Sequence, residues 1–227
     1  MRSVVLLLAL TACAGGAHVR PSFVVADGMA TAGMAADERA AEGERLFGLG
    51  RLEEAEAIFI ELAQDPLADP SDRGFAWWRI GETNFELGRL DRAEAAYARA
   101  LGGLSSEEPW RGVVLYKWAW TAYRDDRYRD ALERFTLVLA TPVPEGRSVL
   151  WVEALEYLAI LVAEDDWDGD GAPDAVVGLD RPEVVAWQAQ LGSVPWLATF
   201  YERLASFFED LALPERAAVV RSRAPLP

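Results

Sequence analysis

The residues that could do chemistry are concentrated in the segment AEDDWDGDGAPD, which runs from Ala163 to Asp174 and holds six carboxylates. Clustered carboxylates can coordinate a hard cation such as calcium. A pair of them can also act as acid and base in glycoside hydrolysis, provided that they face each other across a cleft and burial raises the pKa of one. The third possibility is a solvated acidic turn, because the glycines and the proline in this segment stop a helix.

The spacing of these acids resembles the first nine positions of an EF-hand calcium loop. Alternate Asp side chains converge on one cation when the backbone curls, and Gly171 stands where the chain must turn sharply. Similar D-x-D-x-D-G runs occur in dockerins and in thrombospondin-type calcium repeats. The resemblance implies calcium as a possible cofactor, bound by the carboxylates of Asp166, Asp168, Asp170 and Asp174 and by the carbonyl of Ala172.

The resemblance to a calcium loop ends before its last position. The twelfth residue is Val177, where an EF-hand has a bidentate Glu, and Asp180 is out of register. We therefore expect weak calcium affinity, with a Kd of about 10⁻⁴ to 10⁻³ M, as in extracellular modules. The solvated acidic turn remains the alternative, and no cofactor is required in either case.

Few other residues could support catalysis. The only His is His18 and the only Cys is Cys13, so the chain has no His-based triad, no Cys-rich metal cluster and no internal disulfide. It contains neither a P-loop nor a G-x-G-x-x-G motif. The acids of one exposed loop do not face each other across a cleft. We therefore predict that the protein is not an enzyme, with an envelope hydrolase that uses paired carboxylates as the remote alternative.

The amino-terminal segment predicts secretion and a lipid anchor. It reads MRSVVLLLALTAC, with Arg2 as the positive start and a short apolar core that is too short for a transmembrane helix. Its end, Leu-Thr-Ala-Cys, resembles the bacterial lipobox. The resemblance implies a signal peptide at 1–12, a lipid on Cys13, and a flexible tether over 13–33. Because Ala14 and not Asp follows the Cys, it also implies an outer-membrane lipoprotein facing the periplasm.

The charge of the chain limits its partners. The formal net charge is -15, with 37 acidic residues against 22 Lys and Arg. Nucleic acid is excluded as a partner, because phosphate binding needs clustered cations. Anionic headgroups would repel the protein body, so we expect contact with the membrane only through the lipid anchor.

Three segments of the chain repeat with a spacing of 38 residues. They read GERLFGLGRLEEAEAIFIEL, GETNFELGRLDRAEAAYARAL and AWTAYRDDRYRDALERFTLVL. In each segment an alanine follows the small first residue by twelve positions, an aromatic residue follows by four more, and a short turn lies between. The first residues are Gly43, Gly81 and Ala119, the turn residues are Gly50, Gly88 and Asp126, the alanines are Ala55, Ala93 and Ala131, and the rings are Phe59, Tyr97 and Phe135.

This pattern resembles the tetratricopeptide repeat, two antiparallel helices of about 34 residues that carry W-x2-L-G, A-x3-F and a closing Pro. Trp77-x-x-Ile80-Gly81 matches the first motif, and Pro66 and Pro142 close the first and third segments. The resemblance implies an all-α solenoid of about four to five helix pairs. The small residues let the two helices of a pair approach closely, and the ring fills the remaining space.

The repeats divide the chain into regions. We expect tetratricopeptide-like helices over 34–164, with a fourth first helix that runs from Trp151 to Glu164. The acidic loop, 165–181, interrupts this fourth repeat where its two helices should be joined. Residues 182–227 form further helices, including a degenerate capping repeat in which Arg221 replaces the ring.

The resemblance also implies a partner groove lined by the first helix of each pair. Aromatic rings among acids suit a peptide segment with apolar anchors and some basic residues. We therefore predict a non-catalytic scaffold that recruits other envelope proteins or their peptide segments, with a calcium-dependent adhesion or assembly module as the alternative. The expected groove residues are Trp78, Glu82, Phe85 and Glu86, then Tyr116, Trp120, Tyr123 and Arg124, and finally Glu156, whereas Trp77, Trp118 and Phe135 are expected in the core.

Overall fold

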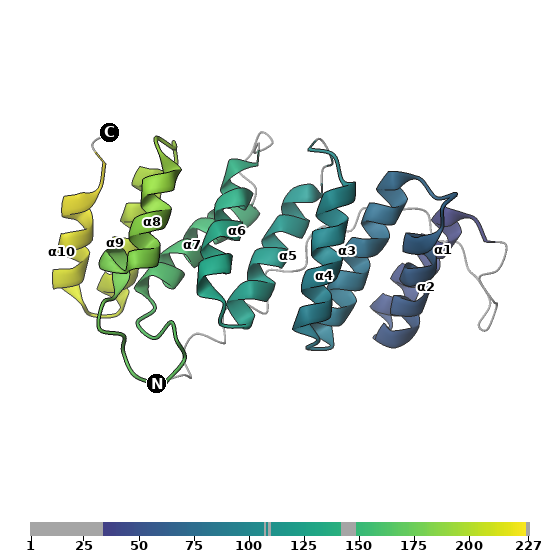
Figure 1. The fold of residues 1–227 in the computed structure, drawn as a ribbon, viewed down its shortest axis with the longest axis horizontal. Coiled ribbons are helices and arrows are strands. Elements are labelled where there is room, and N and C mark those ends of the chain that lie inside the picture. Colours follow the sequence, from purple (N-terminus) through teal and green to yellow (C-terminus); the bar gives the residue numbers. More distant parts are fainter. Residues whose placement is uncertain (1–33, 107, 109, 142–148, 226–227) are drawn as a thin grey trace.

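The computed structural model describes residues 34–225 except 107, 109 and 142–148. Within these residues every regular element is a helix and no strand is present, which confirms the predicted all-α class. The helices follow one another along an elongated molecule (Figure 1). They are α1 (Ala36–Gly48), α2 (Leu52–Gln64), α3 (Pro70–Glu86), α4 (Leu90–Gly103), α5 (Arg111–Arg124), α6 (Tyr128–Ala140), α7 (Val149–Ala163), the 3₁₀ turn η2 (Gly178–Asp180), α8 (Pro182–Leu191), α9 (Leu197–Asp210) and α10 (Pro214–Arg223).

The helices form pairs that stack side by side. We call α1, α3, α5, α7 and α9 the A helices, and α2, α4, α6, α8 and α10 the B helices. In the first three pairs the A and B helices pack closely, and each B helix also contacts the next A helix. Consecutive A helices contact one another from α1 to α9, so they form one continuous face along the array. This face is called the A-helix face below.

The small residues and rings that define the repeat meet as predicted. A Cβ atom on Gly43 would lie 2.5 Å from Cε1 of Phe59, and one on Gly81 would lie 2.5 Å from Cε1 of Tyr97. Both rings are fully buried. In the third pair Ala119 and Phe135 are fully buried in the same core cluster. Close approach of the helices therefore depends on the missing side chain, because a ring occupies the space that a larger residue would need.

Four A helices end in the same way, with one residue in the left-handed conformation. In α1, Gly50 has φ 72°, and the N–H groups of Gly50 and Arg51 donate to the carbonyls of Phe47 and Leu46. This is a Schellman motif, which satisfies carbonyls that the helix leaves free. The same bonds end α3 at Gly88, α5 at Asp126 and α9 at Ala212.

One of these turns offers a stabilising substitution. Ala212 has φ 59°, a conformation that costs an L-residue with a Cβ atom roughly 1 kcal/mol or more but costs glycine nothing. Ala212→Gly should therefore raise the free energy of unfolding by about 0.5–1 kcal/mol, measured by urea denaturation. Ala218→Gly, in the exposed interior of α10, should lower it by about 1 kcal/mol. Equal effects from the two substitutions would contradict the assigned turn.

The fourth repeat departs from the first three. Helix α7 packs against α6 and α9 and lies farther from α8. Trp187 holds α8 in place instead, because its Nε1–H donates to Thr136 Oγ1 of α6 at 2.9 Å and its ring meets Phe200 of α9 at 5.4 Å. The acidic loop separates α7 from α8. The last pair, α9 and α10, packs closely again and closes the array.

Two features bear on the membrane. Among the described helices, none is both long enough and apolar enough to span a bilayer. The predicted signal peptide, the lipidation site Cys13 and the tether up to residue 33 lie outside the described residues.

Candidate partner-binding face and acidic loop

The predicted groove residues lie on α3 and α5, two A helices that contact each other, except Glu156, which lies on α7. Side-chain contacts join the two sets. Phe85 of α3 lies under Arg124 of α5, whose guanidinium carbon is 4.7 Å from the ring centroid, and Lys117 Nζ lies 5.5 Å from the same centroid. Cations over an aromatic ring attract its electron-rich face. The structure therefore brings the predicted residues of the two helices together.

A first aromatic cluster surrounds Trp78. Its indole stacks on Trp110 with centroids 5.3 Å apart and meets the edge of Phe75 at 5.7 Å. All three rings are half-buried. Sequence reasoning missed Trp110 because it precedes α5 at the end of a long link, outside the repeat pattern. We call Phe75, Trp78 and Trp110 the first aromatic cluster.

A second aromatic cluster lies between α5 and α7. The indole N–H of Trp120 donates to the hydroxyl of Tyr116 at 2.9 Å, and Tyr157 of α7 lies 4.9 Å from Trp120 and 5.5 Å from Tyr123. Tyr116 is buried, whereas the other three are half-buried. Burial, followed by contact with Glu153, raises the pKa of Tyr116 well above the usual value of a tyrosine. We call these four residues the second aromatic cluster.

Sequence reasoning missed Tyr157, although a signal was present. Tyr157 follows Ala119 by 38 residues, so the repeat period places a large ring where the earlier repeats have a small residue. That ring stacks on Phe135 at 5.4 Å with an interplanar angle of 10°. The fourth A helix uses Leu158 and Ala159 for its core contacts instead, and both are buried.

Two acids of the A-helix face are paired with cations from the next A helix. Glu82 of α3 accepts a hydrogen bond from the hydroxyl of Tyr97 at 2.5 Å and pairs with Lys117 of α5 at 3.2 Å. Glu156 of α7 pairs with Arg203 of α9 at 3.4 Å. The protein itself therefore compensates much of the negative charge that the sequence places here, whereas Glu86 and Arg124 remain exposed.

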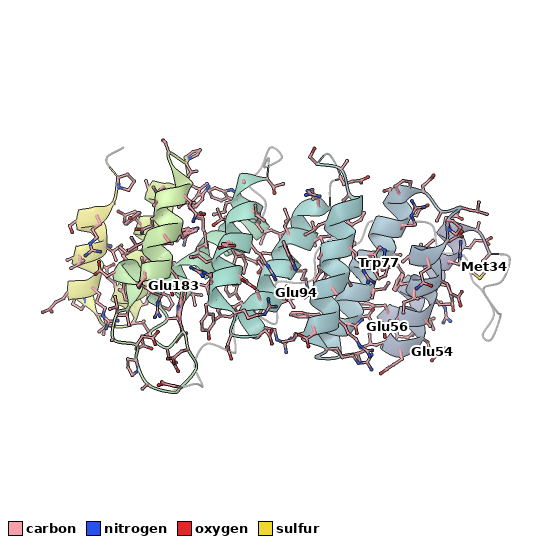
Figure 2. The ribbon with its side chains drawn as sticks, in the orientation of Figure 1. Met34, Glu54, Glu56, Trp77, Glu94 and Glu183 are labelled. Carbon is pink, nitrogen blue, oxygen red and sulfur yellow. The ribbon has the colours of Figure 1, made fainter. Side chains whose placement is uncertain are left out.

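An arginine begins each of the first four B helices. Arg51, Arg89 and Arg127 are spaced by 38 residues, and Arg181 occupies the same capping position before α8. Arg89 pairs with Glu56 of the preceding B helix at 3.2 Å. Arg127 pairs in the same way with Glu94, and Figure 2 shows these two glutamates on neighbouring helices α2 and α4. We call this repeated contact the arginine clamp.

The acidic loop completes the arginine clamp in the fourth repeat. The position 38 residues after Glu94 is Leu132, so α6 has no glutamate at the position that would pair with Arg181. Arg181 pairs with Asp174 of the loop instead, donates to the carbonyl of Glu164 at 3.2 Å and lies 4.4 Å from the ring centroid of Trp167. It is only 4% exposed. An acid from the insertion therefore replaces the missing glutamate of the repeat.

The loop also closes the carboxyl end of α7. The indole N–H of Trp167 donates to the carbonyl of Leu161 at 3.0 Å, and its backbone N–H donates to Asp174 Oδ2 at 3.0 Å. These side-chain contacts replace the Schellman turn of the other A helices. The contact with Arg181, followed by the N–H of Trp167, lowers the pKa of Asp174.

The predicted metal ligands fall into two groups. Asp166, Asp168 and Asp170 each place a carboxylate oxygen within 4.8 Å of the others. Asp166 also accepts the backbone N–H groups of Gly169 and Gly171, at 2.8 and 3.0 Å. Asp174 lies outside this group and is bound by Arg181. Arg181 therefore binds the carboxylate of Asp174, which a calcium loop would direct towards its cation.

Two glutamates that lie far apart along the array have a pKa that burial raises. They are Glu44 and Glu164, and in each of them the loss of hydration favours the uncharged carboxyl group. Glu44 belongs to α1 at one end of the array, whereas Glu164 follows α7 (Figure 1). Two such groups cannot act across one scissile bond.

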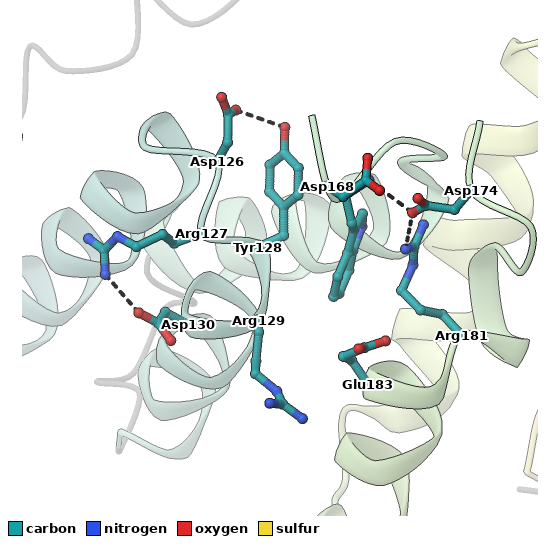
Figure 3. A pocket seen from close by; sticks show the side chains of 10 residues that line it. Asp126, Arg127, Tyr128, Arg129, Asp130, Asp168, Asp174, Arg181 and Glu183 are labelled. Carbon is teal, nitrogen blue, oxygen red and sulfur yellow. Dashed lines mark hydrogen bonds and ion pairs between the residues drawn. The ribbon is translucent and has the colours of Figure 1, made fainter. Parts of the chain in front are cut away.

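An open cleft of about 470 Å³ lies between the start of α6, the acidic loop and α8. Tyr128 and Trp167 contribute rings whose centroids are 5.8 Å apart. Figure 3 shows Arg129 of α6 and Glu183 of α8 on facing sides of the opening.

Comparison with known proteins supports the repeat fold. No protein-family model and no curated protein matches the chain. Among solved structures, a variant of a putative kinesin light chain with nearly identical TPR-like repeats from Podospora anserina has a TM-score of 0.51 at 15% identity, covering 82% of this chain and 91% of that one. BtubC from P. vanneervenii gives 0.51 at 15%, covering 84% and 83%. A double mutant of MamA from strain RS-1 gives 0.50 at 18%, covering 84% and 92%. The chain thus has the predicted tetratricopeptide-like solenoid fold.

Proposed function

We propose that the protein is a non-catalytic scaffold that binds other proteins of the bacterial cell envelope through its A-helix face. The observation that carries this proposal is the pair of half-buried aromatic clusters on that face, separated by the Glu82–Lys117 ion pair. Solenoids of helical repeats present extended surfaces to partners. Trp and Tyr are also the residues that dominate binding energy at protein interfaces.

The two clusters define the chemistry of the partner. Each exposes part of its aromatic surface, so an apolar side chain can be covered at two places along one extended or helical segment. Because Lys117 compensates Glu82, apolar anchors contribute more to affinity than charge does. Glu86 and Arg124 are exposed beside these rings and can pair with charges at the edge of the contact.

We also propose that a lipid on Cys13 anchors the protein to the outer membrane, facing the periplasm. The support is the lipobox-like end of the apolar amino-terminal segment. Cleavage after residue 12 leaves 21 cations against 37 acids, so anionic headgroups repel the body and the lipid is the contact with the membrane. A pull-down and a fractionation test the two parts separately.

The pull-down compares Trp120→Ala with the wild type, both solubilised from native membranes with the protein tagged at its carboxyl end. Partners captured by the wild type should be lost from Trp120→Ala but kept by Glu133→Ala, which changes an exposed residue of α6. Circular dichroism of each variant shows that the fold is kept. Equal capture by Trp120→Ala and the wild type would refute binding through the second aromatic cluster.

The fractionation compares Cys13→Ser with the wild type. The wild type should float with outer-membrane vesicles and incorporate radioactive palmitate. Cys13→Ser should do neither, because the thiol that accepts the lipid is absent. Membrane flotation of Cys13→Ser to the wild-type extent would refute the lipid anchor while leaving the partner-binding proposal intact.

Calcium binding by the acidic loop, the alternative function, remains a prediction. The specific observation in its favour is the convergence of Asp166, Asp168 and Asp170 within 4.8 Å. If they bind calcium with a Kd near ~10⁻³ M, then 10 mM calcium should add roughly 1.4 kcal/mol to the stability and raise Tm by a few degrees over EDTA. Magnesium should have a smaller effect, and Asp170→Asn should abolish the difference. Identical Tm values in EDTA and calcium would contradict the prediction.

A further inference from the structure

The cleft between α6 and α8 belongs to a surface other than the A-helix face. Its walls come from two B helices and from the acidic loop. Its aromatic part consists of Tyr128 and Trp167, which pack at 5.8 Å, and both rings are half-buried. The other eight residues that line the cleft are charged, so a ligand that fits it must combine an apolar part with a charged group.

The cleft exists because the arginine clamp is broken at this junction. Between α2 and α4, and between α4 and α6, a glutamate of one B helix pairs with the arginine that begins the next. At the α6–α8 junction the glutamate is replaced by Leu132, and Arg181 turns to Asp174. In the described part of the chain no ion pair joins α6 to α8, so the space between their starting turns stays open.

The residues that line the cleft carry a net negative charge. They are the five carboxylates Asp126, Asp130, Asp168, Asp174 and Glu183 and the three arginines Arg127, Arg129 and Arg181, of which Arg127 and Arg181 are already paired. Within the cleft, Asp168 and Glu183 have no cationic partner among the described residues. Arg129 stands on the α6 side and forms no ion pair in the described part of the chain (Figure 3). Glu183 therefore faces the exposed Arg129 across an opening lined by Tyr128 and Trp167, whereas Asp168 lies beside Asp174 (Figure 3).

We propose that the α6–α8 cleft is a second docking site, which takes one Lys or Arg side chain from an extended segment of a partner protein. The stem of that side chain packs on Tyr128 and Trp167, and its charged head pairs with Glu183. Arg129 repels a second neighbouring cation, so the site selects an isolated basic residue over a polybasic run. This inference rests on the proposed function, because it assumes that the partner is a protein.

Fluorine NMR of protein labelled with 5-fluorotryptophan tests the proposal. The nine tryptophans give one resonance each, and Trp167→Phe assigns the resonance of Trp167. The probe is the peptide acetyl-Gly-Ser-Arg-Ser-Gly-amide. It should shift the Trp167 resonance to saturation at 50 mM NaCl and bind more weakly at 500 mM. Glu183→Gln should raise its Kd about fivefold, and Arg129→Gln should lower it.

Three results would overturn the proposal. The first is an equal Kd for Glu183→Gln and the wild type, and the second is tighter binding of the peptide in which glutamate replaces arginine. The third is a loss of binding with Asp170→Asn, which would assign the effect to the carboxylates of Asp166, Asp168 and Asp170. A failure of the proposed function would be detected at other resonances, those of Trp78 and Trp120. A tryptophan- and leucine-containing peptide that shifts neither Trp78 nor Trp120 would refute the A-helix face alone, because those resonances are independent of the cleft.

Discussion

Replacing Gly81 by valine should lower the free energy of unfolding by about 3 kcal/mol. A Cβ atom at this position would lie 2.5 Å from Cε1 and 2.6 Å from Cδ1 of Tyr97. The ring cannot withdraw easily, because it is fully buried and its hydroxyl donates to Glu82. The two helices of the second pair must therefore separate, and every contact between α3 and α4 weakens.

Urea denaturation followed by circular dichroism measures this loss. Gly102→Ala is the matched control, because no other residue lies within 4 Å of its Cβ position near the end of α4. That change should be neutral or stabilising by up to about 1 kcal/mol, as expected from helix propensity. If Gly81→Val unfolded at the same urea concentration as the wild type, the close approach of α3 and α4 would be wrong.

Replacing Arg181 by alanine should lower the free energy of unfolding by about 2–3 kcal/mol and release the acidic loop. Arg181 bridges Asp174, the carbonyl of Glu164 and the ring of Trp167 from a buried position. Its removal leaves Asp174 without a cation and takes away the donor to the carbonyl of Glu164. The loop should then lose its hydrogen-bonded closure, whereas the first two helix pairs should remain folded because they lie far from it along the array (Figure 1).

Hydrogen exchange measured by mass spectrometry separates these effects. In Arg181→Ala, peptides covering 161–180 should exchange at least tenfold faster, and peptides from α1 to α4 should keep their wild-type rates. Arg51→Ala is the control, because Arg51 occupies the same position in the first repeat and pairs with Glu54, which is exposed. Unchanged exchange over 161–180 would show that Arg181 does not hold the loop.

The sequence contains enough information to predict the repeat fold. Gly43, Gly81 and Ala119 are spaced by 38 residues, and each is followed sixteen positions later by an aromatic residue. This spacing predicts helix pairs in close contact, and the structure has them. The turn residues Gly50 and Gly88 are also where the repeat places them, in the left-handed conformation. These features are predictable because each depends on residues within one repeat.

The missed features depend on contacts between repeats. Tyr157 and Trp110 join their aromatic clusters from a neighbouring helix or link, so no pattern within one repeat marks them. The role of Arg181 was also missed, because the insertion moves it 54 residues beyond Arg127 and hides its place in the 38-residue series. Asp174 stays a predicted calcium ligand, and the structure adds its ion pair with Arg181, which the resemblance to a calcium loop does not indicate.

The most direct test of the account is photo-crosslinking in growing cells. Benzoylphenylalanine is placed either at Arg124, exposed on the A-helix face, or at Glu133, exposed on the B helix α6. Both positions are at the surface, so the label leaves the fold intact. If the partner binds the A-helix face, a protein adduct should form from position 124 and be lost with Trp120→Ala, and none should form from position 133. Adducts from position 133 with none from position 124 would contradict partner binding through the A-helix face.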